Sequence, residues 1–200
     1  MNKKNLVRVA VMAAVAAVAL TGCTNNDSLI KQYGSGSNQN YISGDGTLTE
    51  IKPADRKDPV EFTTSLDTGA TLKRSDYQGK VMVVNFWYAS CPPCRLEAPD
   101  LESLSQKYDS QGVQFLGVNV RDQTDTAKAF ERSFKISYPS VIDAADAKVQ
   151  LAFSGQRGPN ATPTTIVLDQ KGRVAARVLG EVNKSVLDTL ISDTVAENDK

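Results

Sequence analysis

The 200-residue chain contains no histidine and only three cysteines, and its 23 basic residues are balanced by 23 acidic ones. Without histidine, a zinc site made of protein side chains lacks its usual ligands, and no second Cys-x-x-Cys pair is present to complete one. No basic patch is interleaved with aromatic residues, so the sequence gives no sign of a nucleic-acid partner. We therefore expect neither a bound metal nor nucleic acid.

The N-terminal hydrophobic segment is too short to span a membrane comfortably. Basic residues precede the apolar run 9–20, and Leu20-Thr21-Gly22-Cys23 follows directly. This order resembles the lipobox of bacterial lipoproteins, in which cleavage precedes the cysteine and lipid is attached to its sulfur. We expect residues 1–22 to be a lipoprotein signal peptide and Cys23 to be the lipidated residue. An ordinary secretory signal with an incidental Cys23 is the alternative.

The cysteine count agrees with export. An odd thiol in an exported protein needs an explanation, and lipid on Cys23 would leave only Cys91 and Cys94, in a compartment where disulfides persist. Residues 23–48 are rich in Ser, Asn, Gly and Asp, which predicts a flexible tether after the lipidated cysteine, with an ordered extension as the alternative. Residues 49–196, about 150 positions, suffice for one domain with a single core.

The most informative stretch of the chain is 81–99. Its first part, 81–88, is a nearly continuous run of β-forming apolar residues, as in a buried central strand. It leads into Cys91-Pro92-Pro93-Cys94, which opens a helix expected over 92–108. Free backbone N–H groups and the helix dipole stabilise a thiolate at the first cysteine. Two thiols on one helical turn can close a disulfide with little backbone movement, which is the chemistry of thiol–disulfide exchange.

The remaining patterns predict an α/β fold with a mixed sheet. A turn at Asp67-Thr68-Gly69 indicates a β-hairpin near the start of the domain. Asn183 is a plausible N-cap for the last helix. Strands are expected at 61–66, 70–73, 113–120, 141–142, 164–168 and 174–179, and helices at 124–134, 147–153 and about 184–195.

With these residues in place, the chain resembles thioredoxin-fold proteins of the ResA/TlpA branch from about 61 to 191. Four features carry the resemblance: Trp87 shortly before the Cys-x-x-Cys pair, Pro99 inside the following helix, Thr162-Pro163-Thr164 entering a strand, and the insert 142–158. The resemblance implies the thioredoxin fold, with a central mixed β-sheet flanked by helices, an N-terminal β-hairpin and the insert typical of the TlpA-like branch.

The resemblance also implies roles for individual residues. Cys91 would be the attacking thiolate, exposed at the helix start, and Cys94 the resolving thiol of the redox disulfide. Pro163 is expected in the cis form, which would bring the Thr162 backbone beside Cys91 to bind an extended substrate. Trp87 is compatible with core packing as well as with the border of the site. Further substrate contacts are expected at Trp87, Pro92 and Pro93.

The sequence departs from the thioredoxin pattern at two positions. Ser90 stands before Cys91 where thioredoxins place tryptophan, and Asn85 stands where they usually carry a buried aspartate. Since asparagine cannot relay a proton, the resemblance passes the role of general acid or base to Glu97. A solvated Glu97 on the helix surface is the alternative. Arg95, also next to the site, is expected at the surface, where it could help to stabilise thiolate charge.

The implied function is that of a lipid-anchored thiol:disulfide oxidoreductase at the extracytoplasmic face of a bacterial membrane, without a cofactor. We expect it to act as a reductant, for example on apocytochrome c in cytochrome c maturation, and to be re-reduced by a membrane thiol carrier. Oxidation of secreted protein thiols is the alternative direction. Neither substrate class nor direction follows from the spacing of the cysteines.

Three other functions fit the residues less well. A peroxiredoxin-like peroxidase usually has a Pro- and Thr-rich loop before its cysteine, whereas residues 86–90 here are Phe-Trp-Tyr-Ala-Ser. Copper-handling modules of the same fold use Cys-x-x-x-Cys with a distant histidine, and this chain has neither. A purely structural lipoprotein remains an alternative only if the cysteine pair does not turn over.

Overall fold

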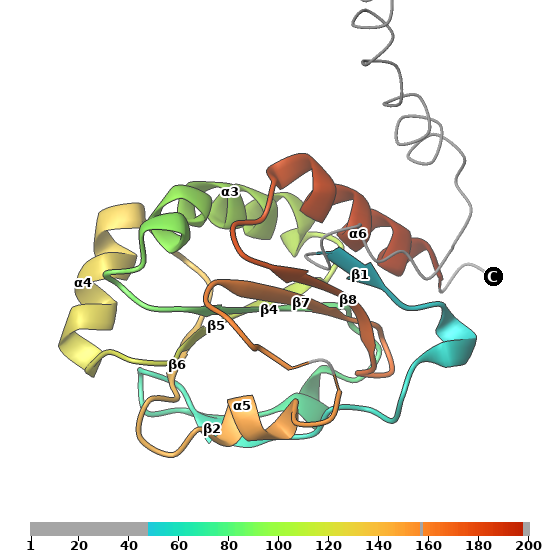
Figure 1. Ribbon diagram of the computed structural model, residues 1–200, viewed down its shortest axis with the longest axis horizontal. Coiled ribbons are helices and arrows are strands. Elements are labelled where there is room, and N and C mark those ends of the chain that lie inside the picture. Colours follow the sequence, from blue (N-terminus) through green and yellow to red (C-terminus); the bar gives the residue numbers. More distant parts are fainter. Residues whose placement is uncertain (1–47, 157, 198–200) are drawn as a thin grey trace, which may run out of the picture. The chain divides into compact units, whose positions relative to one another are not determined.

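The computed structural model describes residues 48–156 and 158–197. The expected signal peptide, the lipidated Cys23 and all of the expected tether except Leu48 therefore lie outside the described residues. Among the described helices, none combines the length and the apolar character needed to span a membrane. The described part has helices on both sides of a six-stranded sheet (Figure 1).

The elements follow the expected order. The strands are β1 (Leu48–Glu50), β2 (Thr63–Ser65), β3 (Thr71–Lys73), β4 (Met82–Trp87), β5 (Gln114–Asn119), β6 (Ser140–Ile142), β7 (Thr164–Leu168) and β8 (Val174–Leu179). The α-helices are α3 (Pro92–Asp109), α4 (Thr124–Phe134), α5 (Lys148–Ala152) and α6 (Lys184–Ala196), and two short 3-10 helices are η1 (Pro53–Asp55) and η2 (Arg74–Tyr77).

The main sheet is mixed, as the sequence predicts. Its order is β1-β8-β7-β4-β5-β6, with β4, β5 and β6 parallel and the other neighbours antiparallel. Strands β2 and β3 form the expected hairpin as a separate two-stranded sheet. Strand β1 was not expected, and it places Leu48, assigned to the tether, in the sheet. The predicted α/β fold class is confirmed, and β1 adds one edge strand to the expected sheet.

Alternation along β4 gives the sheet two apolar faces. Val83 belongs to the core between the sheet and helices α3 and α6, whereas Met82, Val84 and Phe86 belong to the core on the hairpin side. Figure 1 shows α3 and α6 above the sheet, with α5 and the hairpin below it. This alternation explains the nearly continuous apolar run in the sequence, because a strand covered on both faces favours apolar residues on each of them, and Asn85 is the one polar residue of β4.

The insert between β6 and β7 packs on the hairpin side of the sheet. It contains α5, and the completely buried Phe153 follows that helix. The Phe153 ring lies edge-on to Phe86 of β4, with centroids 5.5 Å apart, and 6.4 Å from the Phe62 ring before the hairpin. The insert and the hairpin therefore share one core with the sheet.

Candidate functional site

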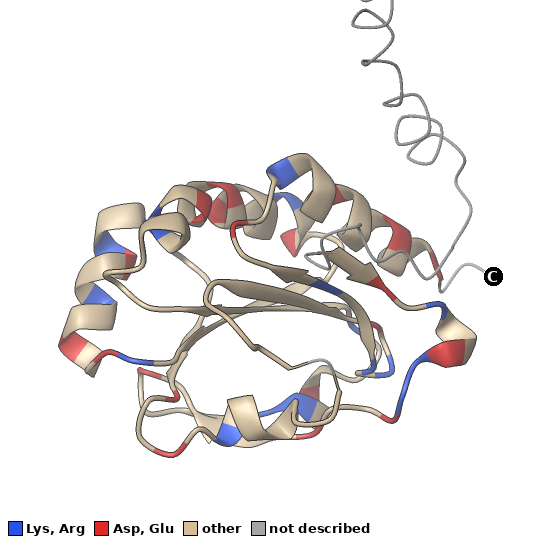
Figure 2. Cartoon of the chain, in the orientation of Figure 1, with Lys and Arg blue, Asp and Glu red and all other residues tan. Residues whose placement is uncertain are grey.

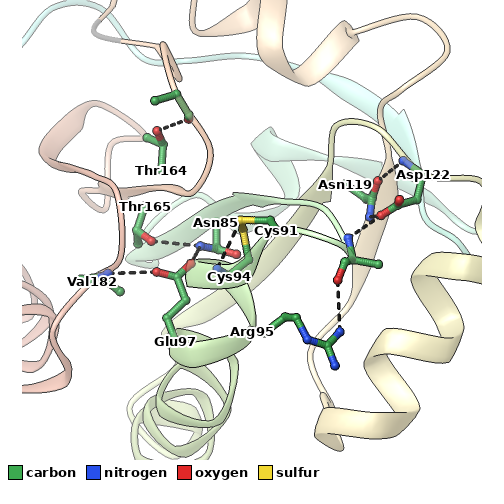
Figure 3. The surroundings of a disulfide bond; sticks show 12 residues. Asn85, Cys91, Cys94, Arg95, Glu97, Asn119, Asp122, Thr164, Thr165 and Val182 are labelled. Atoms are coloured by element: carbon green, nitrogen blue, oxygen red, sulfur yellow. Dashed lines mark hydrogen bonds between the residues drawn. A yellow bond between two sulfur atoms is a disulfide. The ribbon is translucent and has the colours of Figure 1, made fainter.

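The two cysteines form a disulfide at the N-terminus of α3 (Figure 3). Their Cα atoms lie 5.3 Å apart. Cys91 is the N-cap of the helix, and its Sγ accepts a hydrogen bond from the Cys94 backbone N–H at 3.3 Å. Pro92 follows as the first helical residue, where the missing proline N–H costs no helical hydrogen bond. The expected strand–cysteine–helix unit is therefore confirmed.

The sulfur atoms are more deeply placed than the sequence suggests. Cys91 is 1% exposed and Cys94 2% exposed, which corrects the expectation of an exposed first cysteine. The reason is an apolar cluster around the disulfide, to which α4 contributes Ala127 and Phe130. Pro92 is exposed and Pro93 partly exposed, so the dipeptide between the cysteines forms the outer surface here.

Trp87 belongs to this same cluster. Its ring centroid lies 4.4 Å from that of Phe130, and the side chain is only 5% exposed. It lies on the same face of the sheet as Val83, the face covered by α3 and α6, because both are odd-numbered residues of β4 and side chains alternate along a strand. Trp87 therefore packs in the core beside the cysteines, which is the alternative that the sequence left open, and not at the surface as a substrate contact would require.

Glu97 is a buried carboxyl one helical turn beyond Cys94. It is 1% exposed, so the alternative of a solvated surface side chain is wrong. Its Oε1 accepts from Asn85 Nδ2 at 2.8 Å, and its Oε2 from the Val182 backbone N–H at 2.9 Å. Burial raises the pKa of Glu97 to about 7, although the hydrogen bonds from Val182 and Asn85 lower it.

Strand alternation and helix periodicity bring Glu97 to this position. Asn85 lies on the same face of β4 as Trp87, and residues three apart on α3 lie on one side, so Glu97 and Cys94 both point toward this region. Asn85 Nδ2 also donates to Thr165 Oγ1 at 3.1 Å, because β7 pairs Thr165 opposite Asn85. Figure 3 shows Asn85, Glu97 and Thr165 converging beside the disulfide.

The peptide between Thr162 and Pro163 is cis, as expected. Pro163 is buried, whereas Thr162 is partly exposed. The Pro163 carbonyl accepts a hydrogen bond from the Gly180 N–H at 2.8 Å, which ties the segment to the end of β8. That the Thr162 backbone receives a substrate beside Cys91 stays a prediction.

Arg95 is exposed, as expected, but its guanidinium has defined partners. It lies 5.1 Å from the Phe134 ring centroid and 5.8 Å from that of Phe130, and it donates to the Ala89 carbonyl at 3.1 Å. These partners belong to α4 and to the loop before Cys91, and none of these contacts involves a cysteine sulfur. Sequence reasoning missed this arrangement because both aromatic rings come from a distant segment.

Asn119 and Asp122 are two further polar residues near the site that the sequence reasoning missed. Asn119 is the last residue of β5 and Asp122 follows it, and the carboxyl end of β5 lies beside that of the parallel strand β4. Polar residues directly after a buried strand that neighbours the cysteine-bearing strand were the available signal. Within residues 48–156 and 158–197, no cluster of three or more His, Cys, Asp or Glu residues could hold a metal ion.

Comparisons with known proteins agree with this geometry. A family model described as Redoxin matches residues 52–191. The thiol-disulfide oxidoreductase ResA of Geobacillus thermodenitrificans is 34% identical over 124 residues, covering 62% of this chain and 68% of its own length. ResA of Bacillus subtilis is 29% identical over 130 residues, covering 65% of this chain and 70% of its own.

Solved structures show the same similarity. A secreted thiol-disulfide isomerase from Corynebacterium glutamicum has a TM-score of 0.68 at 29% identity, covering 80% of this chain and 99% of its own. A DsbF homologue from Corynebacterium diphtheriae has a TM-score of 0.66 at 30% identity, covering 79% of this chain and 99% of its own. The Redoxin match over residues 52–191 includes β4, the cysteine pair and every strand of the main sheet except β1.

Proposed function

We propose that this chain, which belongs to the Redoxin family and is a thiol-disulfide oxidoreductase of the ResA type, reduces protein disulfides outside the cytoplasm. The observation that carries the proposal is the Cys91–Cys94 disulfide at the start of α3, with the buried Glu97 carboxyl behind it. A redox pair next to an ionisable group whose pKa is about 7 suits proton-coupled exchange near neutral pH.

The first step uses the dithiol form of the protein. The Cys91 thiolate attacks one sulfur of a substrate disulfide, so that a mixed disulfide forms and the other substrate sulfur leaves as a thiolate. The N-terminus of α3 stabilises negative charge on Cys91 before the attack. The exposed Pro92 and the Thr162 backbone are the surfaces on which we expect the substrate to rest.

The second step releases the substrate. Glu97 takes the proton of the Cys94 thiol, and the Cys94 thiolate attacks Cys91 Sγ, which displaces the second substrate sulfur as a thiolate. The protein is left with the Cys91–Cys94 disulfide, and the substrate has gained two electrons. With a pKa raised to about 7, Glu97 can both hold and release a proton near neutral pH, so the base is available without a large free-energy cost.

The cellular setting is the second part of the proposal. Lipid on Cys23 would hold the domain at the extracytoplasmic face of a bacterial membrane through a tether that ends before Leu48, and a membrane thiol carrier would re-reduce the disulfide. Apocytochrome c and secreted proteins with unwanted disulfides are the substrates that we propose. The resemblance of Leu20-Thr21-Gly22-Cys23 to a lipobox supports the anchor, and the similarity to a secreted thiol-disulfide isomerase supports a place outside the cytoplasm.

The reduction potential of the Cys91–Cys94 pair tests the direction. We would equilibrate the chain carrying Cys23→Ser, in which only this pair titrates, against dithiothreitol and glutathione buffers. A potential near or below about −230 mV would support a reductant, whereas one near about −120 mV would show a thiol oxidant instead. A pair that never equilibrates with small thiols would contradict the proposed exchange reaction.

A further inference from the structure

The loop between β4 and α3, residues 88–90, is held by groups from two other parts of the fold. Strands β4 and β5 are parallel neighbours, so the turn after β5 lies beside the loop that leads to Cys91. Arg121 from this turn places its guanidinium 5.0 Å from the Tyr88 ring centroid. The contacts of the next residue, Ala89, are more specific.

Asp122 binds the Ala89 backbone from the side of β5. Its Oδ2 accepts the Ala89 N–H at 2.6 Å and Asn119 Nδ2 at 2.8 Å (Figure 3). Asn119 is completely buried, and its Oδ1 accepts the backbone N–H groups of Asp122 at 2.7 Å and Arg121 at 3.1 Å. The carboxylate is therefore oriented by a rigid partner, and a charged acceptor makes the stronger kind of hydrogen bond.

Arg95 binds the same residue from the side of α3. It donates to the Ala89 carbonyl at 3.1 Å while its guanidinium rests on the Phe134 ring. Both backbone polar groups of Ala89 thus have a charged side-chain partner. Ala89 lies two residues before Cys91, so restricting its backbone also restricts the position of Cys91 Sγ relative to Cys94. We call Asp122 and Arg95 the Ala89 clamp.

We propose that Asp122 and Arg95 are positioning residues that hold Ala89 so that Cys91 Sγ is already placed to bond Cys94, and that they thereby favour the disulfide over the dithiol. The contacts of the two side chains described above do not include the sulfur atoms, so both residues act through the loop. A pre-positioned pair loses less conformational entropy when it closes, and releasing the loop therefore shifts the equilibrium toward the dithiol. The proposal rests on the exchange activity but not on its physiological direction.

The test measures the equilibrium in which the dithiol and oxidised glutathione give the protein disulfide and two reduced glutathiones. In the full chain with Cys23→Ser, Asp122→Ala and Arg95→Met each remove one side of the clamp. We expect each to lower the equilibrium constant roughly three- to tenfold, a potential about 14 to 30 mV less negative. Asp122→Asn keeps an acceptor for Ala89 and should restore most of the parent value.

The matched control is Asp125→Ala, which removes an exposed carboxylate from the first turn of α4 and should leave the constant unchanged. Because both clamp residues act through Ala89, the double variant should change the constant by less than the product of the two single effects. If Asp122→Ala does not fold, Arg95→Met still removes one side of the clamp and should lower the constant, while Asp122→Asn should stay near the parent value.

The outcomes separate the two proposals. A parent protein that exchanges normally, with folded clamp variants at the parent potential, would overturn the clamp alone. Effects that multiply fully in the double variant would also overturn it, because they would show two independent actions. A parent pair that never exchanges with glutathione would remove the proposed function, and the clamp inference with it.

Discussion

Glu97 links the chemistry of the site to the stability of the protein. Its pKa is raised from 4.5 to about 7 in the folded state, chiefly because the carboxyl is buried. As pH rises from about 4.5 to 7, the unfolded chain loses this proton first, so the folded state loses stability over that window. The total corresponds to roughly 3 kcal/mol, since one pKa unit is worth about 1.4 kcal/mol.

Glu97→Gln should remove this dependence on pH. The variant has no proton to lose at this position, so the free energy of unfolding of the oxidised protein should change less between pH 4.5 and 8 than in the parent. Urea unfolding at the two pH values measures it, and the oxidised form keeps both thiols from titrating. Equal pH dependence in the two proteins would contradict the raised Glu97 pKa.

Single residues were predictable from the sequence where the signal was local. The cysteine pair, the cis Pro163 and the Asn183 cap all follow from motifs a few residues long. The partners of Glu97 were not, because Val182 lies 85 residues further along the chain and contributes only a backbone N–H. Almost every residue type carries a backbone N–H, so the sequence does not indicate which one binds Glu97, and only the fold does.

At the scale of elements, the start of α6 connects a helix cap to the site. Asn183 Oδ1 accepts the N–H groups of Ser185 at 2.9 Å and Val186 at 3.4 Å, as the predicted N-cap requires. The preceding residue, Val182, is the one that donates to Glu97. The cap therefore fixes the helix end from which one Glu97 hydrogen bond comes.

Replacing this cap gives a direct stability prediction. Asn183→Ala should lower the free energy of unfolding by about 1 kcal/mol, because two backbone N–H groups lose their acceptor. Asn183→Asp keeps the acceptor and should stay close to the parent. The midpoint of urea unfolding at constant slope measures both variants. A parent-like midpoint for Asn183→Ala would show that the cap adds nothing.

The insert and the hairpin depend on one aromatic side chain. Phe153→Ala should cost about 3 to 5 kcal/mol, since it empties a buried position between Phe86 and Phe62. Leu151→Ala is the matched control, because that side chain is 66% exposed on α5 and should change stability by less than about 0.5 kcal/mol. Thermal or urea unfolding of both variants makes the comparison, and similar losses would contradict this packing.

The regular elements were more predictable than the edge of the sheet. The strong apolar run and the helix patterns of 92–108 and 124–134 correctly located β4, α3 and α4. Strand β1 was missed because three residues are too few to show alternation. Its extended conformation depends on pairing with β8. Short strands of this kind depend on tertiary partners more than on their own sequence.

At the scale of the whole molecule, the proposed lipid anchor makes a prediction that is separate from the chemistry. In a bacterial host that processes lipoproteins, the parent should fractionate with membranes, and Cys23→Ser should not. The reason is that lipid on the Cys23 sulfur would be the group that inserts into the bilayer. Fractionation followed by immunoblotting measures it, and a membrane-bound Cys23→Ser variant would contradict lipid attachment at this residue.

The two edges of the main sheet have a consequence for how the molecule meets its own copies. Both edge strands, β1 and β6, are three residues long, and Leu66 of the hairpin forms a bridge with Val141 of β6. The Asp67 N–H also donates to the Ser140 carbonyl at 2.8 Å. Few backbone groups remain for another strand to pair with, which protects the domain against edge-to-edge aggregation when many copies are crowded together.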